Sequence, residues 1–105
     1  MTTFKRAQRV AERIMIEVSD ILIREVGDPR MQQLTITGVK VSDDLRLAKI
    51  YYVEMGQDDS RRETQEALQK ATGFMRRELG KRLALRYVPE IMFFVDASER
   101  AGKEE

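Results

Sequence analysis

The sequence predicts a single α+β domain in which amphipathic helices cover one face of a three-stranded sheet. The first observation behind this prediction is the length of 105 residues, which suits one domain with its own hydrophobic core. The second is the order of the hydrophobic periodicities, which runs helix, strand, strand, helix, helix, strand along the chain. We expect the domain to span residues 1–98 and residues 99–105 to form a short polar tail.

The first helix is predicted from about Arg6 to Val26. Apolar residues recur there at steps of three and four and form one stripe, which comprises Val10, Ile14, Val18, Ile21 and Leu22. Gly27 suits the position just after this helix, because glycine adopts a left-handed conformation without strain. Pro29 then prevents the helix from continuing.

Two strands joined by a short turn should follow as an antiparallel hairpin. Residues 34–41 alternate in polarity, and the phase slips at Gly38, which predicts a β-bulge. Residues 42–45 form the predicted turn and residues 47–55 the second strand. A third strand is predicted at residues 90–95 near the end of the chain. One face of this third strand should carry Ile91, Phe93 and Val95.

Between the second and third strands the pattern is helical but interrupted. Ser60 precedes Glu63 by three residues, which is the capping-box spacing at the start of a helix. A glycine then breaks the periodicity, which resumes at once with apolar residues at four-residue steps. Glycine costs about 1 kcal/mol relative to alanine inside a helix, so two helices meeting at a kink are predicted. The kink comprises Ala71, Thr72 and Gly73.

The composition excludes several kinds of chemistry. The chain has no Cys and no His, so it lacks thiol nucleophiles, disulfides, Cys/His zinc sites and imidazole acid–base catalysts. Asp43 and Asp44 are interpreted as part of the hairpin turn rather than as a metal site. The longest apolar run, residues 91–95, is too short to cross a bilayer. We therefore expect a protein that is not an enzyme, binds no cofactor, metal ion or small-molecule substrate, and does not associate with a membrane. We also expect it to be cytoplasmic, which this composition allows, and monomeric.

Positive charge is concentrated in two stretches, although the net charge of the chain is only +1. Residues 1–13 hold four basic residues against Glu12, and residues 70–86 hold six against Glu78. Basic side chains on a solvent-exposed face can neutralise RNA phosphates and release their counterions. The candidate RNA-binding residues are Lys70, Arg76, Arg77, Lys81, Arg82 and Arg86 in the second stretch and Arg6, Arg9 and Arg13 in the first. The alternative is that these charges only keep helix surfaces soluble.

Aromatic residues in the predicted strands suggest a second kind of RNA contact. They occur as two adjacent pairs, Tyr51 with Tyr52 and Phe93 with Phe94. Bases of single-stranded RNA stack on exposed aromatic rings of this kind. Because neighbouring residues of a strand face opposite sides, one member of each pair should belong to the core.

Short motifs run in order through residues 5–98. They are Arg9-Val10, Glu25-(two residues)-Asp28-Pro29-Arg30, Thr35-Ile36-Thr37, Val41-Ser42-(one residue)-Asp44-Leu45, Ala48-Lys49, Gly73-(two residues)-Arg76-(two residues)-Leu79, Leu85-Arg86-(two residues)-Pro89 and Phe94-(one residue)-Asp96-(one residue)-Ser98. This ordered set resembles the ribosome-binding factor A family. The predicted order of elements resembles that of a type II KH domain, an RNA-binding architecture.

The resemblance implies a role in ribosome biogenesis. Members of this family bind free 30S subunits and assist late maturation and processing of 16S rRNA near its 5′-terminal helix. Cells need them most at low temperature. They replace the Gly-x-x-Gly loop of ordinary KH domains by an Ala-x-Gly kink, here Ala71-Thr72-Gly73. We therefore expect recognition of rRNA through its phosphates and its shape. A general single-stranded RNA-binding module of KH type and a protein-interaction module are the alternatives.

Overall fold

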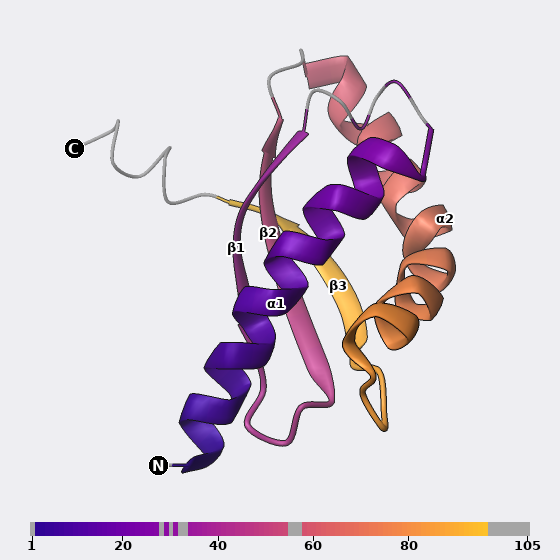
Figure 1. Ribbon diagram of the computed structural model, residues 1–105. Helices are drawn as coiled ribbons and strands as arrows, with labels where there is room; N and C mark the ends of the chain where they lie inside the picture. Colours follow the sequence, from indigo (N-terminus) through magenta and orange to yellow (C-terminus); the bar gives the residue numbers. More distant parts are fainter. Residues whose placement is uncertain (1, 28, 30, 32–33, 55–57, 97–105) are drawn as a thin grey trace, which may run out of the picture.

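The computed structural model has the element order α1, β1, β2, α2, β3 (Figure 1). It describes residues 2–27, 29, 31, 34–54 and 58–96, so the expected tail at residues 99–105 lies outside the described residues. The helices are α1 (Thr2–Arg24) and α2 (Asp58–Leu83), and the strands are β1 (Leu34–Val41), β2 (Leu47–Glu54) and β3 (Glu90–Val95). The predicted α+β class with a three-stranded sheet is confirmed. Within the described part of the chain, neither helix is apolar enough to span a membrane.

The three strands form a mixed sheet in the order β1-β2-β3. The predicted hairpin is confirmed, because β1 pairs antiparallel with β2, while β3 pairs parallel with β2 on its other side. The predicted bulge is also confirmed: the register shifts between Ile36 and Gly38, which leaves Thr37 as the extra residue of β1. The Thr37 hydroxyl donates a 2.5 Å hydrogen bond to Asp96, the residue after β3.

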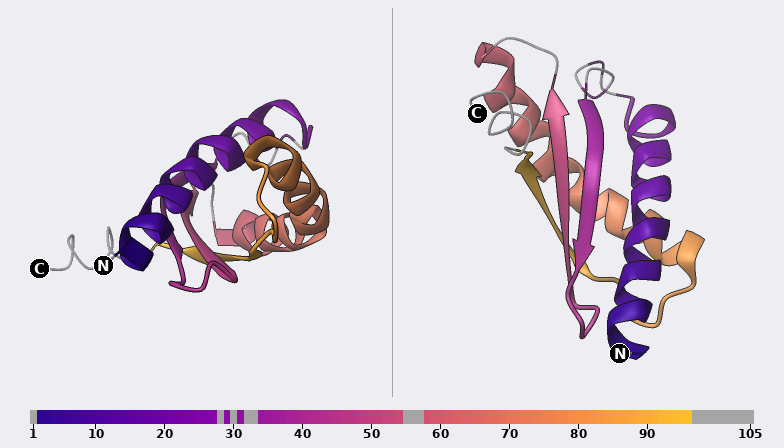
Figure 2. Two further views of the ribbon diagram at one scale, coloured as in Figure 1. Left: turned by 60° about the horizontal axis from the view of Figure 1, so that its bottom comes forward. Right: turned by 90° about the vertical axis from the view of Figure 1, so that its left-hand side faces the viewer.

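Both helices lie on the same side of the sheet, as the two views in Figure 2 show. α1 packs along β1 and against α2, which in turn packs against β3. The predicted stripe of α1 is confirmed as a core face, and its partners come from α2 and the sheet. The fully buried side chains of this core include Ile14, Val18 and Ile21 from α1, Leu68, Met75 and Leu79 from α2, and Ile50 from β2. Each buried side chain of this size contributes roughly 1.5–3 kcal/mol.

The prediction of two helices between residues 60 and 83 is wrong. α2 is one helix without interruption from Asp58 to Leu83, and residues 71–73, where the kink was predicted, are helical. Its axis nevertheless curves along its length (Figure 1). The Thr72 hydroxyl donates to the Leu68 carbonyl at 2.9 Å, a side-chain contact that bends helices without ending them. The helix also begins before Ser60, so the predicted capping box lies inside it.

The two helices end in the same way on different residues. Gly27, after α1, has a φ of 69°, so the predicted left-handed terminator is confirmed. α2 ends at Leu83, and the left-handed residue there is Ala84, with a φ of 51°. Because Ala84 is not a glycine, the sequence pattern did not mark this end of α2.

Candidate nucleic-acid interface

The structure divides the nine predicted RNA-binding residues by what their charges contact. Two of them, Arg76 and Arg82, are half-buried and bind groups of the same chain. The others are exposed, and they are Arg6, Arg9, Arg13, Lys70, Arg77, Lys81 and Arg86. The division follows from helix phase, because α1 and α2 each turn one face to the core and one to solvent.

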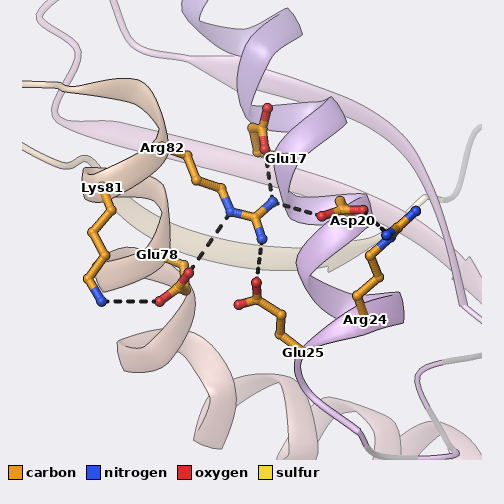
Figure 3. A network of polar contacts seen from close by, with 7 residues as sticks. All are labelled: Glu17, Asp20, Arg24, Glu25, Glu78, Lys81 and Arg82. Atoms are coloured by element: carbon orange, nitrogen blue, oxygen red, sulfur yellow. Dashed lines mark hydrogen bonds and ion pairs between the residues drawn. The ribbon is translucent and has the colours of Figure 1, made fainter.

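Arg82 connects the end of α2 to α1 (Figure 3). Its Nη1 lies 2.9 Å from both Glu17 Oε1 and Asp20 Oδ2, and its Nη2 lies 2.6 Å from Glu25 Oε1. Hydrogen bonds from the guanidinium to Asp20 and then Glu17 raise the pKa of Arg82 above its ordinary value. The positive charge of Arg82 is therefore used to hold the two helices together.

Arg76 connects α2 to the segment that leads into β3. Its Nε donates to the Pro89 carbonyl at 3.1 Å and its Nη2 donates to the Val88 carbonyl at 3.0 Å. Both carbonyls precede β3, so Arg76 positions the start of that strand. Arg76 and Pro89 both belong to the family-like motifs, and in this structure the contact between them stabilises the fold.

The outward face of α2 presents three of the predicted cations in one row. Lys70, Arg77 and Lys81 are separated by seven and four residues, which places them on the same side of a helix. Lys81 Nζ lies 3.5 Å from Glu78 Oε2, but the Lys81 side chain remains 75% exposed. Arg77 is exposed and forms no ion pair with any residue that the structure describes. These charges are available to a polyanion.

A second group of cations meets at the end of the molecule where α1 begins. The turn between β1 and β2 and the segment between α2 and β3 lie at this same end, at the bottom of Figure 1. Together they line an open pocket of about 710 Å³, here called the basal pocket. The basal pocket is lined by Arg6, Asp44, Leu45, Arg46, Leu85, Arg86, Tyr87, Val88 and Glu90. It joins the two basic stretches, since Arg6 comes from the first and Arg86 from the second.

The basal pocket contains two residues that sequence reasoning missed, Arg46 and Tyr87. Arg46 is the only basic residue of the β1–β2 turn, in a stretch that is acidic overall, so charge clustering did not mark it. Tyr87 is 75% exposed, and the Arg86 guanidinium carbon lies 5.5 Å from the centroid of its ring. An arginine stacked on an exposed tyrosine combines a phosphate-binding cation with a surface for a base.

The predicted turn at residues 42–45 is confirmed, and the carboxylate of Asp44 is used inside it. The Ser42 hydroxyl donates to Asp44 Oδ1 at 2.6 Å, and the Arg46 amide donates to the same oxygen at 3.1 Å. These two hydrogen bonds lower the pKa of Asp44 below its ordinary value. The carboxylate also lies in the basal pocket, where it limits the positive charge of the three arginines. Across the described residues no group of three acidic side chains is placed to hold a metal ion.

The aromatic pairs divide between the two faces of the sheet, as expected from strand geometry. Tyr52 is buried, and its ring lies 6.4 Å from that of Phe93, which packs against the core. Tyr51 and Phe94 are on the opposite face, with ring centroids 5.8 Å apart. One member of each pair therefore lies on the face that the helices leave uncovered.

Comparison with known proteins agrees with this description. A family model for ribosome-binding factor A matches residues 6–104. The chain is 61% identical over 102 residues to a ribosome-binding factor A from Syntrophus aciditrophicus (strain SB), covering 97% of this chain and 83% of that relative.

Solved structures show the same fold. The crystal structure of ribosome-binding factor A from Thermus thermophilus superposes with a TM-score of 0.74 at 20% identity, over 85% of this chain and 94% of that one. A homology model of the Thermus thermophilus factor, fitted into a cryo-EM map of a 30S complex, has a TM-score of 0.69 at 20% identity, over 83% and 91%. Because the family model and the Syntrophus relative both match nearly the whole chain, this protein belongs to the ribosome-binding factor A family.

Proposed function

We propose that this protein binds free 30S ribosomal subunits in the cytoplasm and assists late maturation and processing of 16S rRNA, without catalysing a reaction. Membership of the ribosome-binding factor A family supports the first part of this proposal. The Thermus thermophilus member with the same fold has been placed in a 30S complex. In this proposal the protein acts as a monomer near the 5′-terminal helix of 16S rRNA and is needed most in the cold.

One observation from the structure supports RNA binding most directly. Exposed cations form a row on α2, Lys70, Arg77 and Lys81, and a second group around the basal pocket, Arg6 and Arg86. Apart from the long Lys81–Glu78 contact, none of these five forms an ion pair with a described residue. For the other four side chains, no carboxylate of the described residues has to be displaced before a phosphate binds.

The mechanism we propose is electrostatic binding combined with recognition of rRNA shape. Phosphate contacts supply affinity and orientation but carry no sequence information. The major groove of paired RNA is too deep and narrow for side chains to reach the base edges. Proteins therefore recognise paired RNA mostly by the shape of its backbone. Two separate groups of cations suit this mode, because they engage phosphates at two positions of a folded RNA.

The test is co-sedimentation with purified 30S subunits over a range of salt concentrations. The double variant Arg77→Glu, Lys81→Glu is expected to weaken binding on the order of tenfold and to reduce the slope of log affinity against log salt by about 1–2. The matched control is Arg77→Lys, Lys81→Arg, which keeps both charges and should bind like the unmodified protein.

The same measurement can contradict the proposal at two levels. If the unmodified protein does not travel with 30S subunits at low salt, the proposed function is wrong. If it does, but its affinity is nearly independent of salt, the electrostatic mechanism is wrong. Unchanged binding by the Glu variant would exclude the outward face of α2, and the matching variant Arg6→Glu, Arg86→Glu then tests the basal pocket.

A further inference from the structure

The face of the sheet opposite the helices carries an exposed aromatic pair. Tyr51 of β2 and Phe94 of β3 are register partners, and their tilted rings lie 5.8 Å apart. Phe94 is 36% exposed, and Met92, two residues earlier on the same face, is 46% exposed. Neither helix covers these side chains, since both helices pack on the other side (Figure 2).

Beside the aromatic pair lie two lysines that face each other. Lys40 of β1 is the register partner of Lys49 of β2, and both are exposed. Like charges directly opposite each other destabilise an antiparallel strand pair. Neither lysine forms an ion pair with any residue that the structure describes. An anion bound between them would remove this repulsion.

The acidic residues on β3 and next to it do not neutralise the two lysines. Glu90 is on the same face but is the register partner of Leu47, one row further along the sheet. Asp96 follows β3, and its carboxylate accepts the hydrogen bond from Thr37. Among the described residues, therefore, neither Glu90 nor Asp96 forms an ion pair with Lys40 or Lys49.

Gly38 keeps the space next to Tyr51 open. In the register of β1 and β2, Gly38 lies opposite Tyr51, on the side away from Phe94. A Cβ placed on Gly38 would have no other atom within 4 Å. The residue that borders the Tyr51 ring on this side thus has no side chain, which leaves room for a planar group.

We infer that this open face, made of Lys40, Lys49, Tyr51, Met92 and Phe94, binds a single-stranded segment of RNA. Bases stack on the Tyr51 and Phe94 rings, and phosphates lie between the two lysines, as in other proteins that combine aromatic side chains with positive charge to bind single strands. A second copy of this chain suits the face poorly, because pairing two such faces would bring four lysines together. The inference adds a binding surface that the proposed function does not include. It rests on the proposed function only in taking RNA as the polyanion.

The experiment measures binding of a fluorescently labelled, unstructured RNA octamer by anisotropy, in the absence of ribosomal subunits. The double variant Tyr51→Leu, Phe94→Leu is expected to bind on the order of tenfold more weakly, because the rings on which bases stack are removed. Tyr51→Phe keeps an aromatic ring and should bind normally. Lys40→Gln, Lys49→Gln should reduce the salt slope by about 0.7 for each phosphate that the variant no longer neutralises.

Folding of the variants is checked by thermal unfolding, which also provides an independent readout. Removing the repulsion between Lys40 and Lys49 should raise the melting temperature of the glutamine variant while it weakens RNA binding. The variant Arg77→Glu, Lys81→Glu should keep octamer binding, since it changes a different surface.

Three results would overturn the inference. The first is an unmodified protein that binds 30S subunits but not the octamer, which leaves the proposed function intact. The second is a Tyr51→Leu, Phe94→Leu variant that is folded and binds the octamer as well as the unmodified protein does. The third is a dimer in sedimentation velocity that this variant abolishes, which would assign the face to a second copy. Octamer binding without 30S binding would contradict the proposed function alone.

Discussion

Arg82 and Arg77 are five residues apart on the same helix, yet they have opposite roles. The side chain of Arg82 is 21% exposed and contacts Glu17 and Asp20 on α1 and Glu25, the residue directly after α1 (Figure 3). Arg77 is exposed and forms no ion pair with any residue in the described part of the chain. Both lie in the basic stretch at residues 70–86 and look equivalent in the sequence. The difference between them shows that the net charge of a segment in the sequence overstates the charge that the folded protein exposes to a partner.

The acidic residues that neutralise Arg82 come from a part of the chain that is itself acidic. Glu17 and Asp20 lie on α1 after its basic start, and Glu25 directly follows the helix. All three carboxylates contact the same guanidinium. Folding therefore neutralises one cation of the second stretch and leaves its neighbours exposed. The cations that remain exposed are a smaller set, which includes the row on the outward side of α2 and the arginines of the basal pocket.

The largest effect on stability should come from Arg82→Met, with Arg77→Met as its control. Arg82→Met removes the guanidinium that Glu17, Asp20 and Glu25 share, although Asp20 keeps its ion pair with Arg24. The melting temperature should therefore fall by several degrees. Arg77→Met removes no ion pair with a described residue and should change the free energy of unfolding by less than about 0.5 kcal/mol. Thermal unfolding followed by circular dichroism compares the two. Equal destabilisation would show that the Arg82 network does not hold the helices together.

An intermediate effect should distinguish the two glycines of α2. A Cβ at Gly80 would lie 2.9 Å from Val88 Cγ2, and Val88 also supplies a carbonyl to Arg76. Gly80→Ala should therefore be destabilising, since overpacking costs about 1–3 kcal/mol and exceeds the gain of about 1 kcal/mol in helix propensity.

Gly73→Ala is the matched control and should have the opposite sign. Its Cβ would meet only Arg77 Nη1 at 3.7 Å, an ordinary contact, and the helix continues through this position. The variant should be more stable by up to about 1 kcal/mol, as measured by urea unfolding. If Gly73→Ala is instead destabilising, residue 73 needs a backbone conformation that an ordinary helix lacks. Loss of 30S binding by a stabilised Gly73→Ala would place the RNA against this turn of α2.

The smallest effect concerns Asp44, whose charge the turn uses although the residue is exposed. Hydrogen bonds from Ser42 and Arg46 lower its pKa below 3.8, so the charged form contributes stability above that value. This contribution is lost as the pH falls through the lower pKa of the folded state. Asp44→Asn should therefore lower the melting temperature slightly at neutral pH, and the difference should vanish in acid. A difference that is constant with pH would exclude the carboxylate charge as its cause.

The helices and strands were predicted better than the continuity of α2 and the residues that meet at the basal pocket. The apolar stripe of α1, the bulge at Gly38 and the bounds of β3 were predicted because each depends on a local period or a local break. The continuity of α2 was missed, because propensity penalises Gly73 while packing of Met75 and Leu79 in the core carries the helix through it. The site was predicted only in part. Arg46 and Tyr87 reach the basal pocket through folding rather than through any sequence cluster.

The fold class, the family and the two basic stretches could be read from the amino-acid sequence, since they depend on composition, periodicity and short ordered motifs. Which cations remain exposed to a partner became clear only from the packed fold. Arg76 and Arg82 turn inward to carbonyls and carboxylates that are distant in the sequence, whereas Arg77 does not. An ion pair or hydrogen bond requires a distance of about 3 Å between its atoms, and residues remote in the sequence come this close only after the helices pack on the sheet.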